Sequence, residues 1–341
     1  MHQPILHSLV AAASLTLAAP PQKDATPSQL QNVNYGAFTQ TATYSIANEL
    51  GFFEAYGLNV TYLQIPNSTY GYAQLLNGGY DIATGTIDNA VNLRFNSNKN
   101  LTVIGQLDQG PELSIASIPS ITDPTQLKGL ALMVDSPTVG STNLRYADLV
   151  AGHLPNGTDV YATILTYPFP ALAQALPATT RPNIIANISD FIQPISSSAF
   201  TIRQAALTNT TERSVIRSFM SAMYAANQYL AASTPKSQKC SVEAIASQLN
   251  VTTDIATTAY AAATDPLTGE TTSPNGNFTV SRQGLLNIID VRSQFGGFAS
   301  VPAGFNYAQA ILPGTGKLID YSITEEAIAA VNGYKPNGNC S

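Results

Sequence analysis

Hydrophobic and polar positions follow two alternating periods along the chain, one typical of strands and one typical of helices. Leu58, Val60 and Tyr62 recur at every second residue, which predicts a half-buried strand. Ile46 and Leu50, just before them, have helical spacing. Further strands are expected at 32–35, 80–84, 101–107, 112–117, 130–134, 160–165 and 184–188, and further helices at 68–77, 87–96, 141–152 and from 211 onward. This alternation predicts an α/β fold.

Three polar loops, at 36–43, 84–89 and 136–142, each lie between an expected strand and the following helix. In an open α/β sheet such loops gather at the carboxyl ends of the strands, where ligands bind in crevices. Helix N-termini there stabilise polar or anionic groups, although ordinary N-capping also explains the Ser and Thr residues. The candidate ligand-binding residues are Tyr35, Thr39, Gln40, Thr41, Tyr44, Gly85, Thr86, Asp88, Ser136, Thr138, Gly140, Ser141 and Thr142.

Changes in sequence character divide the chain into two expected lobes. An extended, proline-punctuated stretch covers 112–124, and long helical patterns begin after 205. We therefore expect one lobe from residues 30–113 and 206–341, with residues 114–205 inserted as the other.

The amino-terminal segment has the pattern of a secretory signal peptide. Residues 5–17 are mainly apolar and are followed by Ala18, Ala19 and Pro20, which predicts removal of residues 1–18. The run is shorter than the roughly 20 residues that span a bilayer, and no later apolar run reaches that length. An amino-terminal helix of the folded protein is the alternative. We expect a secreted protein with no membrane span.

Composition agrees with an extracellular protein and excludes some partners. The formal net charge is -6, and the 15 Lys and Arg residues are scattered, so no basic face for nucleic acid is expected.

N-x-S/T triplets favour a eukaryotic secretory route with N-glycans. They begin at Asn59, Asn67, Asn100, Asn156, Asn187, Asn209, Asn250, Asn277 and Asn339. In that compartment the two cysteines, Cys240 and Cys340, are expected to form a disulfide, with two free thiols as the alternative.

Few residues are suited to metal binding or nucleophilic catalysis. After removal of residues 1–18 a single histidine, His153, remains, so metal sites built on several His or Cys ligands are excluded. His153 lies in an expected turn, where we interpret it as structural. We expect no metal and no cofactor. Acid–base chemistry would have to use Tyr35, Tyr44, Asp88, Glu112 or Asp190.

The chain resembles the type 2 periplasmic solute-binding proteins, in particular the NMT1/THI5-like and alkanesulfonate- or nitrate-binding group. That pattern has a helix ending in G-[FY]-F, then E-x-x-G-L-x-V, then L-x-x-G-x-x-D-[IV]-A. The three parts occur here at 51–53, 54–60 and 76–83. Residues 123–129 and 136–142 resemble the family's sequence where the chain enters the second lobe. The resemblance implies the two-lobe periplasmic-binding-protein type II fold, with a ligand cleft between the lobes.

Two departures limit what the resemblance implies about chemistry. The pyrimidine-synthase members need a Cys-rich motif and a reactive histidine near the first loop, and residues 38–44 contain neither. Residues 167–182 are proline-rich where the family has a strand and an acidic turn. The identity of the ligand therefore does not transfer from the family.

Two function classes remain open from the sequence. The first is a secreted, monomeric solute-binding protein that clamps a polar or aromatic metabolite between its lobes. The second is a secreted enzyme recruited from that fold, which would use the cleft for acid–base isomerisation, cyclisation or elimination. A carboxylate or Tyr within hydrogen-bond reach of the ligand would favour the enzyme.

Thiol titration of the denatured, unreduced protein is expected to detect no free thiol, because we predict a Cys240–Cys340 disulfide. Such a bond closes a loop of about 100 residues, worth up to about 4.7 kcal/mol in the chain-entropy model. Two thiol equivalents per chain would contradict the prediction.

Overall fold

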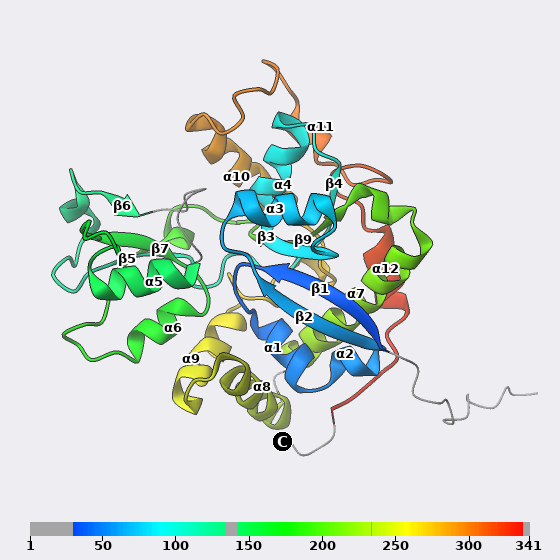
Figure 1. The fold of residues 1–341 in the computed structure, drawn as a ribbon, viewed down its shortest axis with the longest axis horizontal. Helices are drawn as coiled ribbons and strands as arrows, with labels where there is room; N and C mark the ends of the chain where they lie inside the picture. The colour runs from blue at the N-terminus through cyan, green and yellow to red at the C-terminus, as the bar shows by residue number, and fades with distance from the viewer. Residues whose placement is uncertain (1–29, 134–141, 233, 337–341) are drawn as a thin grey trace, which may run out of the picture.

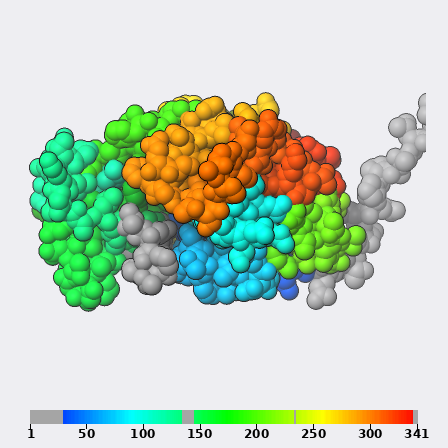
Figure 2. All heavy atoms as spheres, turned by 90° about the horizontal axis from the view of Figure 1, so that it is seen from above, coloured from blue at the N-terminus to red at the C-terminus, as the bar shows by residue number. Residues whose placement is uncertain are grey.

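The computed structural model describes residues 30–133, 142–232 and 234–336, which form two lobes around two separate sheets. Figure 1 shows the smaller lobe, in green, to one side of the larger one. Figure 2 shows the same separation from above, with the orange and red carboxy-terminal segments over the larger lobe. The signal peptide expected at 1–18 lies outside the described residues.

The first lobe contains a five-stranded mixed sheet. Its strands are β1 (Gln31–Ala37), β2 (Leu58–Gln64), β3 (Ile82–Thr86), β4 (Leu101–Gln106) and β9 (Ser198–Arg203), in the spatial order β2-β1-β3-β9-β4. β1 is parallel to β2 and β3, whereas β9 is antiparallel to β3 and β4. The parallel strands β1 and β3 therefore end at the same edge of the sheet, each just before a helix.

Helices cover both faces of this sheet. Successive side chains of a strand point to opposite faces, and here both faces carry apolar side chains. Val33, Tyr35 and Ala37 of β1 join one apolar core, whereas Ala83 of β3 joins the other. The first face packs against α1 (Ala42–Glu49), α2 (Phe52–Ala55), α7 (Thr210–Ala231), α8 (Pro235–Leu249), α9 (Thr253–Ala263) and α12 (Ser322–Ala329). The second packs against α3 (Ser68–Asn77), α4 (Ile87–Val91), the π-helix η1 (Asn92–Asn96), α10 (Arg282–Gln294) and α11 (Tyr307–Ala310).

The second lobe contains a four-stranded sheet with a small core of its own. Its strands are β5 (Ser114–Ser117), β6 (Leu132–Met133), β7 (Ala162–Leu165) and β8 (Asn183–Asn187), in the order β6-β7-β5-β8. α5 (Thr142–Ala151) and α6 (Phe169–Gln174) pack on it, with Leu149 and Phe169 in the core. Short 3-10 turns complete the chain at η2 (Pro124–Leu127), η3 (Ile188–Asp190), η4 (Gln204–Leu207) and η5 (Pro274–Gly276).

The strand β9 is the main difference from the sequence-based expectation. The segment Ser198–Arg203 was not recognised as a strand, and the expected boundary at 205 placed it in the second lobe. The structure pairs it with β3 and β4 in the first sheet, so the chain returns to the first lobe between β8 and β9. The mixed composition of β9, with Ser198, Thr201 and Arg203 among the apolar residues, concealed it.

Two chain crossings join the lobes, at residues 107–113 and 188–197, and the buried Asp108 connects them. Its Oδ1 accepts hydrogen bonds from the backbone N–H of Gly110 at 2.9 Å and of Ser198 at 3.2 Å. The backbone adds a bond from Leu107 N–H to the Ser198 carbonyl at 2.7 Å. Burial raises the pKa of Asp108, although the Ser and Gly donors oppose that shift.

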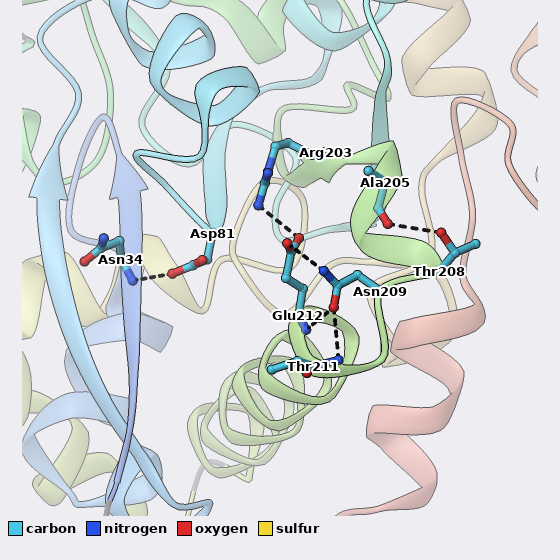
Figure 3. Close-up of polar contacts among 8 residues, drawn as sticks. All are labelled: Asn34, Asp81, Arg203, Ala205, Thr208, Asn209, Thr211 and Glu212. Carbon is cyan, nitrogen blue, oxygen red and sulfur yellow. Dashed lines mark hydrogen bonds and ion pairs between the residues drawn. The ribbon is translucent and has the colours of Figure 1, made fainter.

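Polar contacts also fix α7 to the sheet (Figure 3). Asn209 caps the helix, since its Oδ1 accepts from the N–H groups of Thr211 at 3.1 Å and Glu212 at 3.2 Å. Glu212 in turn forms an ion pair of 2.9 Å with Arg203 at the end of β9. The cap and the ion pair together set where the longest helix begins relative to the first sheet.

The modification sites expected from sequence lie mostly at the surface. Among the described sequons, Asn59, Asn100, Asn156, Asn187, Asn209 and Asn250 are exposed, and Asn67 and Asn277 are half-buried. Cys240 is buried in α8, whereas Cys340 and Asn339 lie outside the described residues, so the disulfide stays a prediction. Within the described ranges, no helix combines the length and apolar character needed to cross a bilayer.

Replacing the α7 cap is expected to destabilise the first lobe. Asn209→Ala should lower the free energy of unfolding by about 1 kcal/mol, because two backbone N–H groups lose their acceptor. Asn209→Ser is the matched control, since a serine hydroxyl restores the cap. Denaturant unfolding of unglycosylated protein measures both, and equal stability of the two variants would contradict the capping role.

Candidate functional site

A cavity of about 180 Å³ lies between the two lobes. The first lobe contributes the loop after β1, the end of β3 and the start of α3. The second lobe contributes α5 and the end of β7, and both crossings complete the wall. The described lining residues are Phe38, Thr39, Thr41, Ser68, Thr84, Gly85, Thr86, Leu113, Arg145, Ile164, Thr166, Ser197 and Ser198.

The structure brings together part of the site expected from sequence. Thr39, Thr41, Gly85 and Thr86 line this cavity. Gln40 instead lines a neighbouring cavity of about 170 Å³. The third expected loop lies largely outside the described residues, including Ser136, Thr138, Gly140 and Ser141, and Thr142 is described only as the start of α5. Tyr35 and Tyr44 lie in the first core with 0% and 2% exposure.

The N-terminus of α1 is occupied by a carboxylate of the protein itself. Glu270, which is 1% exposed, accepts from the N–H groups of Ala42 and Thr43, both at 2.7 Å. Burial raises the pKa of Glu270 to about 7, and hydrogen bonds from Thr43 and Ala42 oppose the shift. Asn227 holds the arrangement by donating to Thr43 Oγ1 at 3.0 Å. The first turn of α1 therefore binds Glu270, and the loop before it meets the cavity through Thr39 and Thr41.

Asp88 makes an internal ion pair instead of lining the cavity. Its Oδ2 accepts from Arg292 of α10, and Arg292 also donates to Asn89 Oδ1 at 3.3 Å. The guanidinium lies over the Phe298 ring, 5.4 Å from its centroid. Asp88 thus links α4 to α10, which is a structural role.

Two buried hydroxyls lie side by side in the first lobe, and one of them belongs to a residue of the cavity wall. Thr84 is 4% exposed and lines the cavity, and the Tyr35 side chain lies beside it on the neighbouring strand. Burial raises the pKa of Tyr35, and the nearby Thr84 hydroxyl opposes that effect. Within the described part of the chain, neither oxygen has a hydrogen-bond partner of ordinary geometry.

The second lobe contributes the charge of the site. Arg145, half-buried on α5, lines the cavity together with Thr166 at the end of β7. Burial raises the pKa of Glu112, in the first crossing, to about 7, and the nearby Ala171 N–H of α6 opposes that shift. The Glu112 φ of 54° is left-handed, which is uncommon for a residue with a Cβ. Tyr167 lies in the first lobe's core, so the second lobe is anchored there.

The lining therefore offers hydrogen-bond donors and one positive charge. Among its described residues, Arg145 is the only one with a formal charge, and none is a carboxylate. The candidate acids are elsewhere, with Asp190 exposed on η3, and His153 is exposed on the second lobe. In the described ranges no three His, Cys, Asp or Glu residues come close enough to hold a metal ion.

A larger hollow of about 710 Å³ lies between α3 and the π-helix η1. Its rim carries several amide side chains, including those of Asn77, Asn92 and Asn98. All its described lining residues come from the first lobe, so movement of the lobes would not enclose a ligand there. We therefore place the candidate site in the smaller cavity between the lobes.

Sequence reasoning missed several of the residues that form the cavity. Ser197 and Ser198 stand at the second crossing, which was not located because β9 was not recognised. Arg145 lies on an expected helix, and its position after a polar loop was a usable signal. Thr84 was expected at the junction of the third strand and the loop 84–89 but was not named as a candidate, and Thr166 lies outside the expected polar loops.

Comparison with known proteins supports the expected resemblance over part of the chain. Residues 38–152 match the family model described as NMT1/THI5 like. This segment contains the three motif parts at 51–53, 54–60 and 76–83. No curated protein sequence matches the chain.

Solved structures show the same fold. The periplasmic nitrate-binding protein NrtA from Synechocystis PCC 6803 has a TM-score of 0.63 at 13% identity, covering 89% of this chain and 90% of its own. The alkanesulfonate-binding protein SsuA from Xanthomonas axonopodis pv. citri, bound to MOPS, has a TM-score of 0.55 at 13% identity, with 81% and 96% covered. A conserved Candida albicans gene product with the generic periplasmic binding protein fold has a TM-score of 0.55 at 15% identity, with 82% and 93% covered. The two-lobe periplasmic-binding-protein type II fold is thereby confirmed.

Stability is expected to fall as pH rises from about 4.5 to about 7. The native state holds the proton of Glu270 up to about pH 7, whereas the unfolded chain releases it near 4.5, so the native state binds more protons in this window. At about 1.4 kcal/mol per pKa unit, the free energy of unfolding falls by about 3 kcal/mol in total, and this loss is complete above pH 7.

Denaturant unfolding between pH 4.5 and 8 measures this effect. Glu270→Gln should flatten the profile, because the amide does not titrate. Asp108 and Glu112 have pKa values shifted in the same direction and should leave a residual slope. An unchanged slope in Glu270→Gln would contradict the assignment.

Proposed function

We propose that this protein is a solute-binding protein that holds a small organic anion between its two lobes. The observation that carries the proposal is the position of Arg145. This cation of the second lobe lines a cavity whose other wall is formed by hydroxyl groups of the first lobe. Among the described lining residues of this cavity, none is a carboxylate.

The charge of the cavity lining supports a negatively charged ligand. A carboxylate or similar group that leaves water needs a partner charge and several hydrogen-bond donors. Arg145 supplies the charge and a planar set of donors. Thr39, Thr86, Ser198 and other lining hydroxyls supply neutral donors from the opposite side.

The remaining lining residues indicate the body of the ligand. Phe38, Leu113 and Ile164 give the cavity apolar surface beside the polar groups. A volume of about 180 Å³ is only slightly larger than a cavity of ~150 Å³ that holds benzene. We therefore propose an acid with one ring or a short chain, which is a narrower class than the polar or aromatic metabolite expected from sequence.

The placement of these groups on both lobes supports binding by closure. A ligand shifts a conformational equilibrium only if it interacts differently with the two states. A ligand that touches Arg145 and Thr86 together makes its full set of contacts only when the lobes are close. The proteins with this fold include one named for binding nitrate and one named for binding alkanesulfonates, and both of these ligands are anions, which supports the ligand charge proposed here.

We also propose that the protein is secreted as a glycoprotein. The support is the amino-terminal signal pattern and the exposed positions of six of the described sequons. The recruited-enzyme alternative has less support, because no carboxylate or Tyr lines the described part of the cavity.

Removing the Arg145 charge is expected to weaken anion binding. Benzoate, methanesulfonate and inorganic phosphate serve as probes in isothermal titration calorimetry and ligand-observed NMR. Arg145→Gln should weaken the best-bound probe about tenfold or more, because a charged hydrogen bond is lost from a partly desolvated site. The melting temperature of the free protein reports separately any effect of the substitution on stability.

The matched control is Arg181→Gln, which removes an exposed arginine of the same lobe that does not line the cavity. This variant should bind the probe as the unmodified protein does. Equal losses of affinity in both variants would indicate a general effect of net charge. An Arg145→Gln variant that binds every probe normally would refute the proposed site.

A further inference from the structure

We propose that an N-glycan attached to Asn100 occupies the hollow of about 710 Å³ between α3 and η1. The inference rests on the proposed glycoprotein and makes it more specific, because it gives one glycan a defined place on the folded chain. The occupant of the hollow is then a covalent part of this molecule and not a free ligand.

Asn100 is the sequon asparagine that lies at this hollow. Among the described sequons it is the one whose asparagine lines the hollow, and it is exposed. Asn67 begins a second sequon nearby, but it does not line the hollow, and its Oδ1 caps α3 by accepting from the Tyr70 N–H at 2.9 Å. A glycan on Asn100 therefore starts at the wall of the hollow itself.

Backbone hydrogen bonds fix the attachment point relative to this wall. The Lys99 N–H donates to the Leu93 carbonyl at 2.8 Å, and Leu93 of η1 also lines the hollow. The Asn100 carbonyl accepts from the Gln204 N–H at 3.1 Å, and β4 begins at the next residue. The first sugar is therefore attached at a position that is held in place against η1.

The lining residues match the chemistry of a sugar ring. Such a ring has apolar C–H faces and hydroxyls that donate and accept hydrogen bonds. Leu76 and Leu93, both half-buried, give the hollow apolar surface beside Ala73. The amides of Asn77 and Asn98 are exposed at its rim and supply donors and acceptors. A glycan seated here covers apolar surface and satisfies its hydroxyls with uncharged groups.

The charges of the lining favour a neutral occupant over an anion. Arg292 lines the hollow, but its guanidinium is paired with Asp88 and donates to Asn89 at 3.3 Å. Lys99, the other cation among the described lining residues, is exposed, so water screens its charge. The hollow therefore differs from the cavity between the lobes, where Arg145 is the charged group.

Size and covalent attachment also support a glycan. A cavity of ~150 Å³ holds benzene, so a hollow of about 710 Å³ has room for more than one sugar ring. A free sugar would bind weakly to so open a surface. Attachment to Asn100 makes the same contacts intramolecular, and the resulting high effective concentration makes weak contacts sufficient.

Resistance to enzymatic cleavage tests this placement. The full chain is secreted from a eukaryotic host that makes oligomannose glycans, and mass spectrometry follows each glycopeptide. In the native protein, endoglycosidase H should cleave the Asn100 glycan about tenfold more slowly than the glycans on the exposed Asn156 and Asn187, because cleavage requires the glycan to leave the hollow. After denaturation, all three glycans should be cleaved at the same rate.

A variant that fills the hollow shows whether the protection comes from this place. Ala73 is exposed on α3 and lines the hollow, so Ala73→Arg puts a long side chain into the space. Asn100 should stay occupied in this variant, but its glycan should be cleaved as fast as the reference glycans. Ala261→Arg, at an exposed position of α9 away from the hollow, is the matched control and should keep the protection. Melting temperatures report whether either variant is damaged.

The contrary outcomes are distinct from a failure of the proposed function. An unmodified Asn100 in protein whose other exposed sequons carry glycans would refute the inference. Native cleavage at Asn100 as fast as at the reference sites, or protection that persists in Ala73→Arg, would also refute it. If no sequon is modified, the proposed glycoprotein fails, and this inference fails with it. The anion site between the lobes stands or falls separately, with Arg145→Gln.

Discussion

The carboxylate of Asp108 binds both chain crossings between the lobes, and the position of the cleft depends on this contact. Its Oδ1 accepts from Gly110 in the first crossing and from Ser198 where the second crossing enters β9. An unpaired carboxylate would be costly in so buried a place, so its donors are held in a fixed arrangement. This arrangement brings Leu113, Ser197 and Ser198 to the wall of the cavity. The same residues that join the lobes therefore also form the base of the site.

A second internal carboxylate changes how the cleft can recognise a ligand. In a sheet of this topology, the N-terminus of α1 would be an obvious place for an anion. Glu270 fills that place with a group from the chain. The N-terminus of α1 is thus occupied from within. In the function we propose, the charge for a ligand comes instead from a side chain, Arg145, so recognition requires the second lobe.

The sequence predicted the fold more completely than the site. Alternating periods located β1 to β5, β7 and β8 closely, because each of these strands has a continuous apolar face. The strand β9 was missed, since its pairing with β3 and β4 depends on contacts distant in the chain. The expected site residues Thr39, Thr41, Gly85 and Thr86 line the cavity, because loops after parallel strands must meet at one edge. The pairing of Asp88 with Arg292, 204 residues away, left no local signal in the sequence.

A crystal structure of the protein with a bound organic acid would test the account most directly. The account predicts that the negatively charged group contacts Arg145 and that the same molecule touches Thr86 or Ser198 of the first lobe. The ligand should then be enclosed by both lobes in the cavity between them. An acid bound by the first lobe alone, for example in the hollow between α3 and η1, would contradict the central claim.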